Sequence, residues 1–217
     1  MYNNECNTTC LRKYTALGDS LAVGLGAFWG CGYPRLYYKW LWDCKNLKSL
    51  CYCNLAVLGW TSADLLKALR CNCNYRNAVR ESCIITLDIG GNDMLRSKYC
   101  PERLQQALEC YKKNLCAILA EIRCLNPTAT IYVMDIYNPY PCSHPMYATA
   151  EPWVTAFNEI IWSTAGRSEY RISGVAGVYS AFKGNEQQYT LICRNNVHPS
   201  TLGHRIICDC FKTIYIP

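Results

Sequence analysis

Residues 13–21, KYTALGDSL, open the part of the sequence that decides the fold. The first five letters form a short β-type run, and Gly18-Asp19-Ser20 follows it directly. A glycine-rich stretch at 24–32 then leads into a helical segment around 34–44. A strand, a polar turn and a helix in this order form the repeating unit of parallel sheets, which place ligands at the carboxyl ends of their strands.

The same alternation continues to the end of the chain. Further strands are expected at 50–58, 83–89, 129–136 and 172–178, and further helices after a cap at Thr61 or Ser62 and at 101–126, 152–166 and 199–214. We see no internal repeat, linker or low-complexity segment in the 217 residues, of which 51% are apolar. The sequence therefore predicts a single α/β domain over residues 1–217, with a parallel sheet covered by helices on both faces.

Charge and hydropathy argue against two classes of protein. The 22 Lys and Arg against 16 Asp and Glu give a formal charge of +6, but the basic residues are scattered, so nucleic acid is not expected as a partner. No window reaches the roughly 18 consecutive apolar residues of a membrane-spanning helix. Met1 to Lys13 lacks the apolar core of a signal peptide. We expect a soluble chain with no transmembrane segment, and the cytoplasm is the favoured compartment; the oligomeric state stays open.

The cysteine content is unusual. There are 17 cysteines, an odd number, and three of their spacings are C-x-C pairs, with no C-x-x-C and only three histidines in the chain. This pattern favours neither a zinc site nor a disulfide framework. In the expected helix at 101–126, Cys116 and Cys124 fall on the side away from the apolar stripe, where a soluble helix normally carries charged residues.

Two residues stand out as candidates for covalent chemistry. Ser20 directly follows a strand and precedes a helix, which suits an exposed nucleophile, although a serine there is also a common helix cap. His198 lies just before the last helix and is the natural candidate for a base. His204 inside that helix and His144 in a proline-rich loop are less well placed.

Four ordered blocks give the sequence a family resemblance. They are Gly18-Asp19-Ser20-Leu21, Gly59 after the second strand, Gly90-Gly91-Asn92-Asp93 after the third, and Val197-His198-Pro199 near the end. In this order and at these strand ends, they resemble the GDSL, or SGNH, hydrolase family over almost the whole chain. The stretches 14–20 and 136–139 are most similar to the small lipase or esterase-like proteins of Bacillus-type bacteria.

The resemblance implies both a fold and an activity. The fold is a flavodoxin-like three-layer α/β/α sandwich with a five-stranded parallel sheet, and the activity is that of a serine esterase or lipase acting on a small-molecule ester without cofactor or metal. Ser20 would be the nucleophile and His198 its base. The backbone N–H groups of Ser20 and Gly59 and the side chain of Asn92 would form the oxyanion hole. Taken alone, Gly59 is equally a turn residue, and Asn92 can cap its own loop.

One position departs from the family pattern. The pattern has Asp three residues before the histidine, and this chain has Asn195. An asparagine can accept a hydrogen bond from the imidazole but cannot offset its positive charge, and in serine proteases that change costs about 10⁴ in rate. Three explanations stay open: a slow enzyme, a Ser-His dyad oriented by another acceptor, or an aspartate in the gene at a position where this sequence has the nearly isosteric asparagine.

The chemistry of the site leaves the substrate open. The same residues would serve a thioesterase or a carbohydrate deacetylase, and loss of the carboxylate would suit a lipid- or carbohydrate-binding module that no longer hydrolyses. We expect the acyl pocket to be lined by the aromatic regions 28–38 and 137–147, whose other interpretation is core packing.

Overall fold

The computed structural model describes residues 12–45, 47–97 and 99–217. Its main sheet has five parallel strands in the order β2-β1-β3-β4-β5. The strands are β1 (Arg12–Gly18), β2 (Leu50–Asn54), β3 (Ser82–Asp88), β4 (Thr130–Met134) and β5 (Gly174–Ala176). The expected five-stranded parallel sheet is therefore confirmed.

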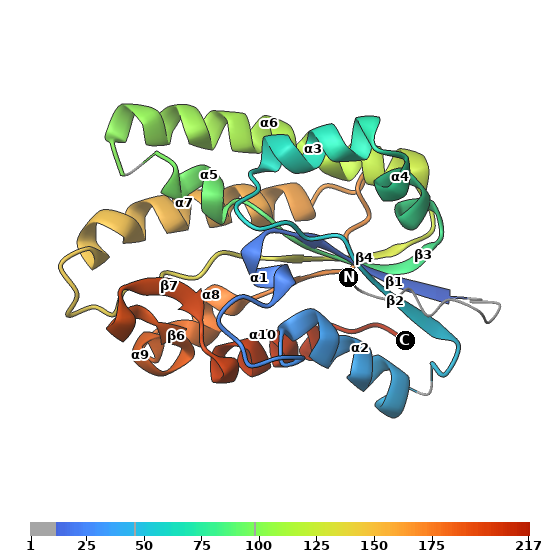
Figure 1. The fold of residues 1–217 in the computed structure, drawn as a ribbon. Helices are drawn as coiled ribbons and strands as arrows, with labels where there is room; N and C mark the ends of the chain where they lie inside the picture. The colour runs from blue at the N-terminus through green and yellow to red at the C-terminus, as the bar shows by residue number, and fades with distance from the viewer. Residues whose placement is uncertain (1–11, 46, 98) are drawn as a thin grey trace.

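Helices cover both faces of this sheet (Figure 1). One face packs against α3 (Ser62–Cys71), α4 (Cys73–Arg80), α6 (Pro101–Leu125) and α7 (Tyr147–Ala165), and the other against α2 (Tyr33–Cys44), α8 (Val178–Phe182) and α10 (Thr201–Thr213). Shorter elements are α1 (Ser20–Val23), α5 (Gly91–Leu95), α9 (Glu186–Tyr189), the 3₁₀ turn η1 (Ile192–Arg194) and an antiparallel pair, β6 (Thr190–Leu191) with β7 (Asn196–Pro199). This is a three-layer α/β/α sandwich, as expected.

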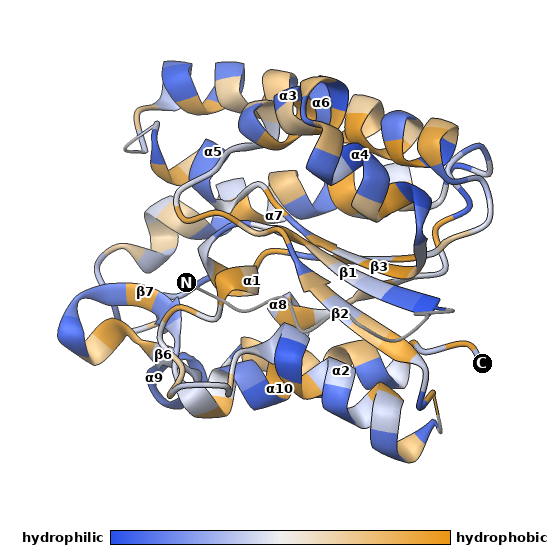
Figure 2. Cartoon of the chain, turned by 45° about the vertical axis from the view of Figure 1, so that its right-hand side comes forward, coloured by the Kyte–Doolittle hydropathy of each residue, from blue (hydrophilic) through white to orange (hydrophobic). Residues whose placement is uncertain are grey.

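The helices bury the faces that their apolar spacing indicates. In α6, Tyr111, Leu115 and Ile118 are almost fully buried and Cys124 is exposed as expected, but Cys116, expected on the same outer side, is half-buried and packs against the core. The orange and blue bands along the helices in Figure 2 show this two-sided character. The stripe residues join the larger of the two cores, between the sheet and α6.

Several elements differ from the expected bounds, and β2 and α7 differ most at one end. β2 ends at Asn54 rather than continuing to residue 58, although the N–H groups of Leu55 and Val57 still donate to carbonyls of β1, at 3.0 and 3.2 Å. The Asn54 side chain interrupts the regular strand: its Oδ1 accepts from the N–H of Ala56 at 3.0 Å and its Nδ2 donates to the Ala22 carbonyl at 2.7 Å. Helix α7 begins at Tyr147, not at Pro152, so the proline lies inside the helix, which forgoes one backbone hydrogen bond there.

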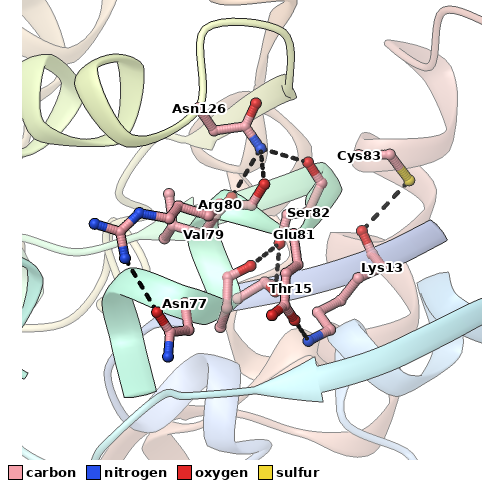
Figure 3. A network of polar contacts seen from close by, with 10 residues as sticks. Lys13, Thr15, Asn77, Val79, Arg80, Glu81, Ser82, Cys83 and Asn126 are labelled. Carbon is pink, nitrogen blue, oxygen red and sulfur yellow. Dashed lines mark hydrogen bonds and ion pairs between the residues drawn. The ribbon is translucent and has the colours of Figure 1, made fainter. Parts of the chain in front are cut away.

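A polar network fixes the end of the sheet opposite the nucleophile turn (Figure 3). The side-chain amide of Asn126 donates to the carbonyls of Val79 and Ser82, at 2.8 and 2.7 Å. The Ser82 hydroxyl is in turn 2.6 Å from Oγ1 of Thr15, which joins β3 to β1. Since this network holds the starts of the two central strands, their carboxyl ends are held in a fixed relation to each other.

Candidate active site

The nucleophile candidate lies at the carboxyl end of β1. Asp19 caps the short helix α1, its Oδ1 accepting from the N–H of Leu21 at 3.1 Å, and Ser20 is the first residue of that helix. The first N–H groups of a helix have no partner within it. The backbone N–H of Ser20 is therefore placed to donate to a ligand, beside its own hydroxyl.

Asp88, at the end of β3, explains the glycine in this turn. It pairs in register with Gly18, and a Cβ built on Gly18 would lie 1.9 Å from Oδ1 of Asp88. The same oxygen accepts from the N–H of Asp19 at 3.1 Å, and the other accepts from the Tyr33 hydroxyl. Asp88 and Tyr33 were missed in the sequence because neither belongs to a motif, and together they brace the residue before the nucleophile.

His198 is brought to Ser20 from the far end of the chain. Its Nε2 is 3.0 Å from Oγ of Ser20, and its Nδ1 is 2.6 Å from Oδ1 of Asn196. Because an amide oxygen only accepts, Nδ1 carries the proton and Nε2 is left to accept from the serine hydroxyl. The Tyr137 hydroxyl donates to the carbonyl of Val197 at 2.7 Å and so ties β7 to the chain after β4. With the proton on Nδ1, His198 is in the tautomer that a general base needs.

The residue that contacts Nδ1 of His198 is not the one expected from the sequence. Asn195, expected there, is exposed and adopts a left-handed conformation (φ 54°), in which its N–H closes the 3₁₀ turn onto the Ile192 carbonyl at 2.9 Å. Asparagine is one of the few residues that tolerate this conformation. The turn brings the next residue, Asn196, to the imidazole, an outcome that depends on backbone geometry and left no signal in the sequence.

The other two histidines lie elsewhere. His204 is buried, accepting from the N–H of Tyr33 at Nδ1 (3.3 Å) and donating from Nε2 to the carbonyl of Leu25 (3.0 Å), and burial lowers its pKa to about 4. His144 stacks on Tyr140, with ring centroids 4.8 Å apart. Both have structural contacts that account for them.

Asn92 links three of the four sequence blocks. Its Nδ2 donates to Oδ2 of Asp19 at 3.0 Å and to the carbonyl of Trp60 at 2.9 Å. It also lines the same pocket as Ser20 and His198. Asn92 is therefore next to Ser20 and His198, and in this structure its two N–H bonds hold the neighbouring loops.

Gly59 occupies a tight turn beside this cluster. The N–H of Trp60 bonds to the Val57 carbonyl at 3.3 Å, and Gly59 has φ 75°, which glycine adopts at no steric cost. Its Cβ position faces open space among the described residues. Gly59 does not line the pocket itself; its carbonyl accepts from Nη2 of Arg96 at 2.5 Å.

The pocket beside Ser20 has a volume of about 110 Å³ and mostly apolar walls. Its apolar lining comes from the ends of β3 and β4 and the residues just after them, from α5 and from β7, and includes Ile89, Met94, Leu95, Met134, Ile136, Pro139 and Val197. The expectation for region 28–38 is wrong, because Tyr33 and Tyr37 are fully buried in the core between α2 and the sheet. Of region 137–147, Tyr137 and Pro139 do line the pocket.

The carboxyl groups around the nucleophile turn are buried, and burial shifts their ionisation. It raises the pKa of Asp19 to about 7, and it raises the pKa of Asp88 well above its usual range, helped by the charge of Asp19. Burial also raises the pKa of Asp93, which accepts from the N–H and hydroxyl of Ser62. Burial alone lowers the pKa of His198, which favours its neutral form.

These carboxyl groups predict a pH-dependent stability that Asp88→Asn should reduce, leaving the contributions of Asp19 and Asp93. A carboxyl whose pKa is raised by folding stabilises the chain below its ordinary pKa, and this contribution is lost as the pH rises towards the folded pKa. The melting temperature should thus fall between pH 5 and pH 8. The amide introduced by Asp88→Asn could still accept from the N–H of Asp19 and donate to Tyr33, so we expect the variant to melt about 3 °C or more above the parent at pH 8.

Calorimetry of parent and variant at both pH values checks this. Asp43→Asn, which removes an exposed carboxylate on α2, is the matched control and should leave the pH dependence as it is. An Asp88→Asn chain that melts below the parent at pH 8 would show that the carboxylate itself stabilises the turn.

Among the described residues, no group of three or more His, Cys, Asp or Glu is arranged to hold a metal ion. Across residues 12–45, 47–97 and 99–217, no helix is both long and apolar enough to cross a membrane. Fourteen described cysteines are free thiols, and Cys51 is disulfide-bonded.

The chain is similar in sequence and in fold to known hydrolases. The model of the GDSL-like lipase/acylhydrolase family matches residues 16–206. The chain belongs to this family. Among relatives, the spore germination lipase LipC of Bacillus licheniformis is 27% identical over 91% of this chain and 93% of its own, and the uncharacterized protein YpmR of Bacillus subtilis is 26% identical over 92% of this chain and 78% of its own.

Solved structures share the same fold. The lipase Lip_vut3 from a goat rumen metagenome superposes with a TM-score of 0.77 at 27% identity, covering 94% of this chain and 97% of that one. A catalytic mutant of Axe2, an acetylxylan esterase from Geobacillus stearothermophilus, reaches a TM-score of 0.72 at 18% identity, covering 95% of each chain. The family and fold are those expected from the four sequence blocks.

Proposed function

We propose that this member of the GDSL family is a carboxylic ester hydrolase that works through an acyl-enzyme on Ser20. One observation carries the proposal: Nε2 of His198 lies 3.0 Å from Oγ of Ser20, in the tautomer that accepts a proton, at an apolar pocket. This is the relation of nucleophile and base found in serine hydrolases. The relatives named as lipases support an ester as the substrate.

The reaction follows from these groups. Oγ of Ser20 attacks the ester carbonyl carbon while its proton passes to Nε2 of His198, and the imidazolium keeps its Nδ1–H bond to Asn196. The tetrahedral intermediate collapses, the carbon–oxygen bond to the alcohol breaks, and the alcohol takes the proton from Nε2. Water then attacks the acyl-enzyme by the same route, which releases the acid and restores Ser20.

The developing oxyanion needs neutral donors. We propose the backbone N–H groups of Ser20 and Gly59 and the side-chain amide of Asn92, as the family pattern implies; Gly59 lies in the turn beside the pocket rather than in its lining, so its N–H would reach the oxyanion only from the pocket's edge. The Nδ2 group of Asn92 already donates to Asp19 and Trp60, so one of these bonds would have to be shared with the oxyanion. The raised pKa of Asp19 makes its partly neutral carboxyl a weaker acceptor, which favours such sharing.

A chromogenic ester tests the proposal against its alternatives. The purified chain should hydrolyse p-nitrophenyl butyrate with saturation kinetics. A binding module would show no turnover of this ester or of a butyryl thioester. Faster turnover of the thioester, or of an acetylated oligosaccharide, would instead identify a thioesterase or a deacetylase on the same Ser-His pair.

Asn92→Ala is expected to lower kcat by about 10² while KM stays within a few-fold, because an oxyanion donor acts mainly in the transition state. Steady-state kinetics on the chromogenic ester measure both constants. Asn114→Ala is the matched control, since Asn114 is a half-buried asparagine whose amide bonds to Ser62 outside the pocket, at 2.9 Å. A similar loss of kcat in both variants, with equal losses of melting temperature, would mean that Asn92 only holds the loops together.

A further inference from the structure

The exposed apolar side chains of this protein gather around the active-site end of the sheet. Eight large apolar residues are exposed among the described residues; five of them follow β1 or β2, and a sixth follows β7, which carries His198. We call these six the apolar rim: Val23, Leu25, Phe28, Trp29, Leu58 and Leu202. Phe28 and Trp29 are the most exposed, at 80% and 87%. None of the six lines the pocket, so the acyl site does not explain their exposure.

Backbone contacts join the rim into one surface. The side chain of Asn54 bonds to the Ala22 carbonyl, which places the loop carrying Leu58 against α1. The N–H of Phe28 donates to Oγ1 of Thr201 at 3.0 Å, which places the tip of the 24–32 loop beside Leu202. Figure 1 shows this loop running from α1 past the start of α10 to α2.

The rim is fixed to the catalytic residues. The N–H of Leu25 bonds to the Ser20 carbonyl at 3.0 Å, and Nε2 of His204 bonds to the Leu25 carbonyl at 3.0 Å. Gly26 packs so closely on the residue after His198 that a Cβ would lie 2.2 Å from the Pro199 carbonyl. An ordered loop thus carries two strongly exposed aromatic side chains, a pattern that marks an interaction surface rather than an unstructured tip.

Five of the six rim residues lie on two segments without acidic residues, 20–42 and 187–208. These segments do carry Arg35, Lys39, Arg194 and Arg205, all of them exposed. Beside the sixth, Leu58, Arg96 bonds to the Gly59 carbonyl and pairs with Asp64 at 3.8 Å. Tryptophan and phenylalanine beside basic residues are the side chains that bind lipid headgroup regions, where the rings enter the interface and the cations meet anionic headgroups.

We propose that the apolar rim binds the surface of an anionic lipid aggregate and so presents the Ser20 pocket to esters held in that surface. The role in catalysis rests on the proposed ester hydrolysis, whereas the binding itself does not. Apolar insertion supplies the contact and the basic residues select anionic over neutral lipid. A neutral surface should be bound more weakly, and salt should weaken binding to the anionic one.

The test measures binding in a chain that cannot turn over. Ser20→Ala protein is sedimented with vesicles of phosphatidylglycerol and phosphatidylcholine in equal parts, and separately with vesicles of phosphatidylcholine alone. We expect binding to the mixed vesicles and a fall in partitioning of about tenfold or more when Phe28→Ser and Trp29→Ser are added. Ile216→Ser, at another exposed apolar residue (57%), is the matched control and should bind as the parent does. Melting temperatures confirm that each variant is folded.

Several results would overturn the inference. One is undiminished binding after the Phe28 and Trp29 changes, and another is equal binding to neutral vesicles. A third is a chain that ignores both vesicles but is retained by insoluble xylan through the same two residues, which would make the rim a carbohydrate platform. A dimer that ignores both vesicles and dissociates when Phe28 and Trp29 are changed would assign the rim to a second copy of this chain. Failure of ester hydrolysis alone leaves these binding results standing.

Discussion

A fluorophosphonate probe should add a single covalent label to this protein, and Ser20→Ala should abolish both the label and ester hydrolysis, with a loss in kcat of about 10⁴ or more. The reason is geometric. Ser20 is the hydroxyl in contact with Nε2 of His198, and its own N–H, at the start of α1, is placed for the oxyanion. Removing Oγ takes away the atom that forms the acyl-enzyme.

Intact-mass spectrometry before and after labelling, together with hydrolysis of p-nitrophenyl butyrate, measures the effect. Ser163→Ala is the matched control: this serine is exposed on α7 and bonds locally, to the Ile160 carbonyl at 3.2 Å. It should keep the label and the rate. If the Ser20→Ala chain still took up one label, the nucleophile would lie elsewhere and the proposed acyl-enzyme mechanism would be wrong.

The sheet was predictable because each strand has a short apolar run that ends in glycine or a polar cluster. The same rule misplaced the end of β2: the apolar run of Leu55 to Leu58 still bonds to β1 through two N–H groups, but the regular strand stops at Asn54, whose side chain caps the N–H of Ala56. Apolar letters do not distinguish a strand from an apolar loop that packs on its neighbours. The turn-forming bonds of Asn54 are made with residues on both sides, and only the fold reveals them.

The contact between Ser20 and His198 was predictable from sequence, but its surroundings were not. Ser20 and His198 lie at the ends of elements whose order alone brings them to one edge of the sheet. The pocket wall depends instead on which side chains of β4 and α5 face that edge, and letters such as Met94 and Met134 look like any core residue. Asp88 likewise looked like an ordinary end of a strand, and its effect on the Asp19 N–H appears only when β1 and β3 are paired.

The acceptor at Nδ1 of His198 leads to the second large prediction. Asn196 holds the imidazole in the right tautomer but carries no charge, so the imidazolium of the transition state is stabilised less than by a carboxylate. Asn196→Asp should therefore raise kcat/KM at least about tenfold, and by up to roughly 10⁴ if the local geometry is kept. The substitution replaces a nitrogen by an oxygen and adds no bulk, so repacking cannot account for a gain.

The pH profile gives a second readout of the same change. In the parent, burial lowers the pKa of His198, so the acidic limb of kcat/KM should lie below the ordinary histidine value of about 6.5. A carboxylate at 196 would favour the charged imidazole and move that limb to higher pH. A substitution that only changed the structure elsewhere would not both raise kcat/KM and move its acidic limb to higher pH.

Asn195→Asp decides between the two neighbouring asparagines. Asn195 is exposed and closes the turn through its backbone N–H, so a carboxylate there should change kcat/KM by less than about threefold, the effect of a surface charge screened by water. Both variants differ from the parent by the same chemical change, one residue apart. If Asn195→Asp accelerates the reaction and Asn196→Asp does not, the backbone at η1 and β7 must rearrange during catalysis so that residue 195 meets Nδ1. If neither does and the parent is inert towards esters and thioesters, the protein is better described as a binding module built on a hydrolase fold.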